Sequence, residues 1–338
     1  MRDLENRSTP LLVVDLPIFE SNLTTMSQSL PGLSLRPHVK AFKSTSVAKR
    51  LFAAGHTAFC CATIKEVEGM VSAGLADDLL LANEVLDTRR LGSVIADGAH
   101  VTVAVDSVET IDAASRGGVK NVLIDVNVGL RRCGCTVPQA GRLADYARGN
   151  GLNIRGVMGY EGHLMMMQDR EKQADEVRIS MDALLAAHQD VGGPIISAGG
   201  TGTFELNTWA TEIQAGSYLF MDTHYAELGL PFQQCLSVLA RVISIAEDRS
   251  WAVVDAGSKA LGMDHGNPTV YGGIVAFCSD EHTTLYPEKG QRQVPWAIGD
   301  LIHLSPAHVD PTVSKHPEIL AVRGNKVIEE WLVDLRDW

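Results

Sequence analysis

The chain has 338 residues, of which 45% are hydrophobic, so it can bury one large core and a smaller second one. Its formal net charge is −12 and its 29 Lys and Arg residues are dispersed, which argues against nucleic acid as a partner. No segment of about 18 residues is free of charge, and the opening MRDLENRSTP lacks the apolar core of a signal peptide. We therefore expect a cytoplasmic protein without a membrane partner. The six cysteines follow no regular spacing, which is typical of reduced thiols.

Apolar runs alternate with helical patterns from about residue 34 to residue 220. The strand candidates are 34–39, 57–61, 78–82, 100–105, 121–127, 155–159, 194–198 and 213–220. Between them, stretches such as IKEVEGMVSAGL repeat apolar residues at three and four positions, as amphipathic helices do. Eight strands that alternate with helices predict an N-terminal (β/α)8 barrel of the TIM type over residues 17–238. A doubly wound open sheet is the alternative.

After residue 240 the pattern changes to short β-rich runs separated by Gly, Pro and Asn turns, as in TVYGGIVAFC and DLIHLSP. This texture predicts a C-terminal all-β domain. The opening run PLLVVDL is also strand-like but precedes the barrel pattern, so we expect it to pair with the C-terminal sheet. The predicted β-rich domain therefore comprises residues 1–16 and 239–338.

Polar residues and glycine turns follow the predicted barrel strands. In a parallel barrel the loops after the strands form the active face. The residues at these positions are Lys40, Thr63, Asn83, Asp106, Arg132, Glu161, His163, 199–203 and 216–218. This set of side chains is suited to a small anionic ligand.

Two glycine-containing segments lie at the last two predicted strands, one directly after 194–198 and one within 213–220. In SAGGTGTFE, Gly200 and Thr201 offer close backbone approach and donors to phosphate oxygens, although a tight turn with positive φ would also explain the glycines. Gly216-Ser217-Tyr218, one strand later, favours a phosphate site, because such barrels bind phosphate after strands seven and eight. Neither segment matches a nucleotide-binding motif.

Lys40 ends the first predicted strand, in LRPHVKAFK. A lysine amine in an apolar, partly cationic pocket can lose its proton near neutral pH and form a Schiff base with an aldehyde. Arg36 and Lys43 would supply the cationic surroundings. A single lysine at a strand end is more often solvated or ion-paired, but together with a phosphate site it indicates pyridoxal 5'-phosphate.

A second group of candidate site residues lies in SPAHVDPTVSKH, within the predicted β domain. His308 and Asp310 on an extended segment would point to the same side and could share one metal ion, although a His-x-Asp pair is common by chance. His265 and the pair Glu281-His282 are further polar candidates, of a kind more often found as surface groups.

Several segments together resemble the metal-activated pyridoxal enzymes typified by D-threonine aldolase and D-serine dehydratase, within the alanine-racemase-like fold. These segments are TPLLVVDL, LRPHVKAFKS, CCATIKEVE, LLLAN, the RCG at 132–134, GYEGH, SAGGTGT, TEIQAGSYLFMD, DAGSK and SPAHVDPTV. The resemblance covers almost the whole chain in the same order, and it implies a homodimer. It departs from the family at Lys40-Ala41-Phe42-Lys43, where the family often has KTHK, and at Leu130 and Arg131.

The resemblance implies a role for each candidate residue. Lys40 takes the Schiff-base role, Arg132 lies close to the phenolic oxygen of the cofactor, and Tyr160 of GYEGH contacts the cofactor. The phosphate is held by Gly200, Thr201, Gly216, Ser217 and Tyr218. His308 with Asp310 holds a divalent metal ion, Mn²⁺ or Mg²⁺, with Zn²⁺ as an alternative.

The same parts support two reactions of a β-hydroxy amino acid. In an aldolase the Cα–Cβ bond breaks to give glycine and an aldehyde, whereas in a dehydratase a keto acid and ammonia form. Asp310 is a hard oxygen ligand where the dehydratases tend to have cysteine, which favours the aldolase. The base for the β-hydroxyl is His163 or a metal-bound water. A pyridoxal-phosphate-binding protein without catalysis is a third hypothesis.

Overall fold

The computed structural model describes residues 4–338, so the first three residues of the predicted β-rich domain lie outside the described chain. The described residues form two compact units. The barrel unit comprises Met26–Lys40, Val47–Gly216 and Leu335–Trp338. The β unit comprises the residues up to Thr25, together with Ala41–Ser46 and Ser217–Asp334.

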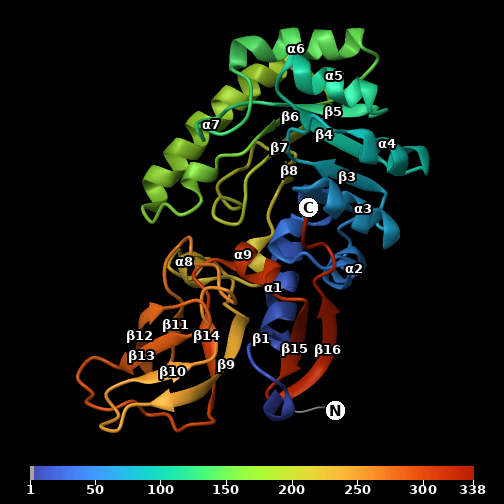
Figure 1. Cartoon of the computed structure of the whole chain (residues 1–338). Helices are drawn as coiled ribbons and strands as arrows, with labels where there is room; N and C mark the ends of the chain where they lie inside the picture. The colour runs from blue at the N-terminus through green and yellow to red at the C-terminus, as the bar shows by residue number, and fades with distance from the viewer. Residues whose placement is uncertain (1–3) are drawn as a thin grey trace. The chain divides into compact units, whose positions relative to one another are not determined.

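The barrel unit is built on a parallel sheet whose strands follow one another in chain order (Figure 1). The strands are β2 (Ala58–Cys61), β3 (Asp78–Leu81), β4 (Val101–Val105), β5 (Asn121–Asp125), β6 (Asn153–Gly159), β7 (Ile195–Ala198) and β8 (Glu212–Ile213). Six of these strands contribute one side chain each to a buried apolar cluster of Cys60, Leu80, Ala104, Leu123, Met158 and Ile195. Helices cover the outer face of a parallel sheet, so its strands are buried and apolar on both faces.

Residues 35–38 close this sheet into a ring. Leu35 pairs in parallel with Ile213 of β8, and His38 pairs in parallel with Cys60 of β2. The backbone N–H of Arg36 donates to Ile213 (2.9 Å) and that of Cys60 donates to Pro37 (2.9 Å). The segment therefore acts as the first strand, and the predicted (β/α)8 barrel is confirmed.

The last predicted strand, 213–220, is wrong beyond its start. Strand β8 ends at Ile213, and Ser217–Leu219 form a 3-10 helix (η5) that belongs to the β unit. Tyr218 and Leu219 are nevertheless buried. A short apolar run reports burial but cannot separate a strand from a tight turn, which explains the error.

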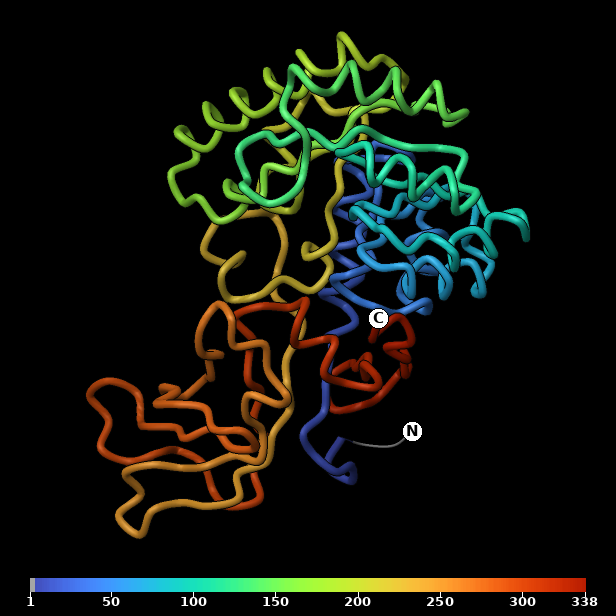
Figure 2. The backbone as a smooth tube through the Cα atoms, turned by 45° about the horizontal axis from the view of Figure 1, so that its top comes forward, coloured from blue at the N-terminus to red at the C-terminus, as the bar shows by residue number. Residues whose placement is uncertain are grey.

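The helices of the barrel alternate with the strands. They are α2 (Thr45–Ala53), α3 (Ile64–Ser72), α4 (Arg89–Ala96), α5 (Val108–Arg116), α6 (Val137–Gly149) and α7 (Arg170–Val191). Thr63 caps α3 by accepting from the backbone N–H of Glu66, whose carboxylate accepts from the N–H of Thr63 in return. Figure 2 follows the chain through α6 and α7, which lie side by side outside the sheet.

The β unit is mostly strands. They are β1 (Leu11–Asp15), β9 (Leu236–Ile245), β10 (Ala252–Val254), β11 (Thr269–Val270), β12 (Gly273–Cys278), β13 (Thr283–Pro287), β14 (Leu301–Ser305), β15 (Glu318–Arg323) and β16 (Lys326–Leu332). The opening strand β1 lies between antiparallel β9 and parallel β15, so the expected pairing of PLLVVDL with the C-terminal sheet is confirmed. Among residues 4–338, no helix combines the length and the apolar composition that spanning a bilayer requires.

Three helices accompany these strands, but only the last lies wholly within the predicted β-rich domain, which is mostly strand as predicted. They are α1 (Leu16–Ser29), which follows β1 directly, and the short α8 (Thr223–Ala226) and α9 (Val309–Ser314). Helix α9 lies inside the segment SPAHVDPTVSKH, which the pattern predicted to be extended.

Candidate active site

Lys40 and the two glycine turns leave the barrel at the same edge. Lys40 lies in the 3-10 helix η3 (Val39–Ala41), directly after the closing segment. The N–H of His38 donates to Ala215 (3.1 Å), and Gly216 is the next residue of the segment that follows β8. The N–H of Gln214 donates in turn to Ala198 (3.0 Å), which precedes the turn 199–203. The structure therefore brings Lys40 and both turns to the ends of three neighbouring parallel strands.

Tyr160, which follows β6, connects two other predicted site residues. The guanidinium carbon of Arg132 stands 5.6 Å from the centroid of the Tyr160 ring. Ring atom Cε2 of Tyr160 lies 3.4 Å from the position that a Cβ on Gly200 would occupy. His163 packs against Gly129, since a Cβ on that glycine would lie 2.7 Å from Cε1 of His163. Arg132, Tyr160 and Gly200 thus form one group.

The glycine-rich turn after β7 is held by Glu161, a fully buried carboxylate. Its oxygens accept from the N–H of Gly199 (3.0 Å), the hydroxyl of Thr203 (3.0 Å) and the amide of Asn207 (3.0 Å). Gly199 has φ +76°, a conformation that favours glycine. The sequence indicated Glu161 only as a strand-end residue, because its partners lie far along the chain.

Acidic side chains surround Arg132 at the ends of β3, β4 and β5. Burial raises the pKa of Asp125 well above its ordinary value, and the carboxylates of Glu84 and Asp106 add to this increase against the charge of Arg132. Burial, with a hydrogen bond to Glu84, also raises the pKa of Cys133 to about 11. Cys133 is therefore a neutral thiol near pH 7 rather than a nucleophilic thiolate.

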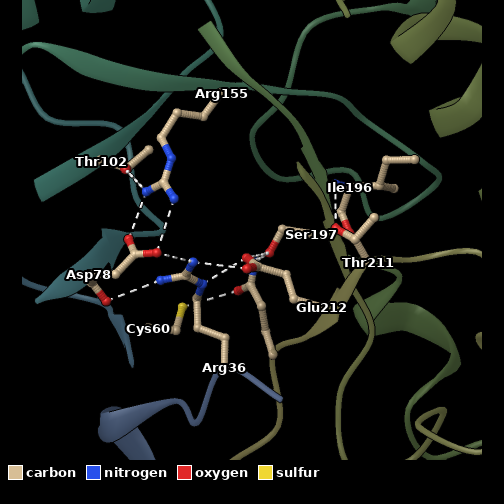
Figure 3. A network of polar contacts seen from close by, with 10 residues as sticks. Arg36, Cys60, Asp78, Thr102, Arg155, Ile196, Ser197, Thr211 and Glu212 are labelled. Carbon is tan, nitrogen blue, oxygen red and sulfur yellow. Dashed lines mark hydrogen bonds and ion pairs between the residues drawn. The ribbon is translucent and has the colours of Figure 1, made fainter. Parts of the chain in front are cut away.

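Arg36 does not supply a cationic environment for Lys40, contrary to expectation, because its charge is compensated inside the barrel (Figure 3). Its Nε and Nη2 donate to the two carboxylate oxygens of Glu212 at 2.7 Å and 2.8 Å. Nη2 also donates to Asp78 at 3.0 Å, and Arg155 binds the same carboxylate from the other side. Burial lowers the pKa of Arg36, but Glu212 and Asp78 outweigh burial and raise the pKa overall. Lys43, the other expected cation, belongs to the β unit.

Ser217 and Tyr218, the remaining predicted phosphate contacts, lie in η5 of the β unit. The Tyr218 ring is fully buried and packs 5.5 Å from the ring of Phe232, centroid to centroid. Burial raises the pKa of the Tyr218 hydroxyl, so this group stays neutral in any physiological buffer.

The expectation that His308 and Asp310 share an extended segment is wrong. His308 is the N-cap of α9 and Asp310 lies in its first turn, where residues two apart do not share a face. The buried carboxylate of Asp222 accepts from the N–H of Val309 at 3.1 Å. Burial raises the pKa of Asp222, which also responds to the charges of His308 and Asp310, so these three side chains gather at the start of α9.

Two further histidines and an aspartate surround His308. Its Nδ1 lies 2.6 Å from Oδ2 of Asp264, and its ring stacks on that of His265 with centroids 4.0 Å apart and planes at 4°. The His224 ring stacks on His265 at 5.1 Å. Partial burial raises the pKa of Asp264, but the hydrogen bond and charge of His308 reverse this and leave the pKa below its ordinary value. The sequence indicated His265 only as a surface candidate and did not reveal Asp264 or His224.

Imidazole nitrogens and carboxylate oxygens together form a donor set that suits divalent metal ions. Asp264, His265 and His308 each bring a possible ligand atom within 4.8 Å of the others. Asp310 is not part of this group, and its role as a ligand stays a prediction. The chemistry of the side chains around the start of α9 therefore fits a metal site.

A (β/α)8 barrel with a lysine beside two glycine turns, joined to a strand-rich unit, defines a protein of the alanine racemase type. Residues 14–224 match the family model for the alanine racemase N-terminal domain, and residues 235–322 match a putative serine dehydratase domain. The chain belongs to this alanine racemase-like family, in the group that holds the D-threonine aldolases and related dehydratases. The family implies pyridoxal phosphate as the cofactor.

Relatives match this chain over nearly its full length. It is 34% identical to the D-threonine aldolase of an Arthrobacter species, with 97% of this chain and 92% of that protein covered. It is 33% identical to the 3-hydroxy-D-aspartate aldolase of Paracoccus denitrificans, with the same coverage of 97% and 92%. The crystal structure of D-threonine aldolase from Filomicrobium marinum superposes with a TM-score of 0.92 at 32% identity, covering 99% of this chain and 98% of that one.

Proposed function

We propose that this chain is a pyridoxal phosphate- and divalent metal-dependent aldolase. It would cleave β-hydroxy-D-amino acids such as D-threonine into glycine and an aldehyde. The observation that carries the proposal is the exit of Lys40 and the two glycine turns from three neighbouring strands of the barrel. The full-length similarity to a D-threonine aldolase and a 3-hydroxy-D-aspartate aldolase supports the same reaction.

The cofactor-binding residues follow from the strand ends. Lys40 would carry the cofactor on its Nζ, while Gly200, Thr201 and Gly216 would bind the phosphate with backbone and hydroxyl donors. Ser217 and Tyr218, next in the chain, are proposed to complete these contacts. Arg132 and Tyr160, which contact each other, would flank the cofactor ring. When bound, pyridoxal phosphate accepts the electron pair released as a bond at Cα breaks.

Two groups of this chain would act on the substrate hydroxyl. His308 and Asp310 are proposed to hold Mn²⁺ or Mg²⁺, or alternatively Zn²⁺, because imidazole and carboxylate ligands are compatible with all three ions. His163 packs against Gly129, which precedes Arg132 by three positions in the chain. It is our protein candidate for the base that accepts the hydroxyl proton, with water as the alternative.

A dehydratase is the second candidate, because residues 235–322 match a putative serine dehydratase domain. The test is to incubate the purified protein with D-threonine, D-allo-threonine, phenylserine and 3-hydroxyaspartate. Glycine and aldehyde are expected as products, whereas keto acid and ammonia would show the dehydratase. EDTA should abolish turnover and added Mn²⁺ should restore it. Bound cofactor without turnover of any of the four substrates would favour a pyridoxal-phosphate-binding protein.

The remaining expectations stay predictions. We propose that residues 17–238 form the cofactor domain and that residues 1–16 with 239–338 form the metal-carrying domain. We also propose a homodimer in the cytoplasm. Sedimentation of the purified protein would show whether it is a homodimer. Limited proteolysis would locate the domain boundaries.

A further inference from the structure

The His308 imidazole is held from two directions. Oδ2 of Asp264 lies 2.6 Å from its Nδ1, and the flat face of its ring is covered by His265. The side chain of His308 is about one quarter exposed (23%), whereas that of Asp264 is about half exposed (53%). The carboxylate therefore reaches His308 from the solvent side, and the imidazole cannot turn freely.

The contact with Asp264 decides where the imidazole proton lies. A carboxylate accepts hydrogen bonds and does not donate them, so Nδ1 must carry the hydrogen. In a neutral imidazole the other nitrogen, Nε2, then has a lone pair. Metal-binding histidines commonly donate one ring N–H to a carboxylate in this way, which orients the ring and raises the basicity of the coordinating nitrogen.

The stacking of His265 argues against a shared metal ion. A nitrogen lone pair lies in the plane of its ring, and an ion coordinated by imidazole lies about 2.1 Å away in that plane. Because the two rings are parallel within 4° and their centroids are 4.0 Å apart, an ion in the plane of His308 stands well outside the plane of His265. A separation of 2.6 Å between Asp264 and His308 is likewise a hydrogen bond rather than the spacing of two ligands.

We propose that Asp264 is a positioning residue, which fixes His308 as the Nδ1–H tautomer and presents Nε2 to the divalent metal ion, with His265 as a stacking support that does not bind the ion. This inference rests on the proposed function, since it takes His308 as a metal ligand. It assigns different roles to three side chains that would otherwise be read as three equivalent ligands.

The first test reads the tautomer directly in the metal-free full-length protein. Two-dimensional ¹H–¹⁵N spectra that correlate ring carbon protons with both nitrogens should show His308 protonated on Nδ1. Asp264→Asn should keep this tautomer, because the amide oxygen still accepts, whereas Asp264→Ala should move the proton to Nε2. Parent protein with the His308 proton on Nε2 would overturn the proposal.

The second test measures Mn²⁺ affinity by titration calorimetry, with His308→Ala as the reference for a lost ligand. Asp264→Ala should weaken binding by about 10- to 100-fold, the usual effect of removing such an outer partner. His265→Phe keeps a flat ring without nitrogens and should bind within about twofold of the parent if stacking is its role. A loss as large as that of His308→Ala in the His265→Phe variant would make His265 a ligand and overturn the assignment.

The matched control is Asp248→Ala, which removes a surface carboxylate of the same unit that is hydrogen-bonded to Ser250. It should leave Mn²⁺ affinity unchanged. The two proposals fail separately. Protein that cleaves β-hydroxy amino acids but carries the His308 proton on Nε2 contradicts the role of Asp264 alone. Protein with the expected tautomer and metal affinities, but with no aldehyde product, contradicts the aldolase alone.

Discussion

Replacing Arg36 with methionine should destabilise the barrel strongly. The guanidinium is buried, with 2% of the residue exposed, and it supplies two hydrogen bonds to Glu212 and one side-chain bond to Asp78. Methionine fills similar space without charge. Asp78 keeps Arg155, whereas within residues 4–338 Glu212 keeps only the hydroxyl of Ser197 as a side-chain donor.

The size of the effect follows from the unequal loss at the two carboxylates, because Asp78 keeps an arginine partner and Glu212 does not. Removing one partner of a buried ion pair costs about 3–5 kcal/mol, because the other charge is left uncompensated. For a unit of 150–250 residues, in which 1 kcal/mol shifts the melting temperature by about 2–4 °C, the expected decrease is roughly 6–20 °C.

Thermal unfolding followed by circular dichroism measures this prediction. The double variant Arg36→Met/Glu212→Gln should be more stable than Arg36→Met alone, because the uncompensated carboxylate of Glu212 has been removed. The control Arg89→Met removes an arginine whose ion pair with Asp87 is exposed, and it should leave the melting temperature nearly unchanged. A loss below about 1 kcal/mol in Arg36→Met would refute the view that this network carries buried charge.

Three further predictions concern acid stability and the two proposed sites. Burial raises the pKa of Asp78, but Arg155 and Arg36 outweigh it and hold that pKa at about 2, so its stabilisation is complete above about pH 4 and is lost as the pH falls towards 2. Asp78→Asn should flatten this part of the pH–stability curve, and an unchanged curve would contradict the assignment. Lys40→Ala should abolish the visible absorbance of lysine-bound cofactor, and retention of the full band would exclude Lys40 as the attachment site. His308→Ala and Asp310→Ala should keep that absorbance but lose turnover that depends on added metal, and variants as active as the parent without metal would remove the metal role.

The sequence alone determined much of the architecture of this protein. Apolar periodicity reports which face of an element is buried, and this local property was sufficient to indicate the barrel, its strand ends and a strand-rich C-terminal part. It also placed Lys40 and the two glycine turns after strands, where parallel topology gathers them. Periodicity failed where short apolar or polar runs fold as single helical turns, as at Ser217–Leu219 and Val309–Ser314.

Only the tertiary structure decided which charged groups meet. Arg36 finds Glu212 176 positions away along the chain, and His308 finds Asp264 44 positions away. No local pattern encodes such pairs, because they depend on barrel closure and on the packing of α9 against distant loops. The sequence therefore predicted the kinds of side chains at the two sites. The tertiary structure decided that Arg36 neutralises buried carboxylates and that His308 is oriented by Asp264, since a Coulomb interaction depends on distance in space rather than along the chain.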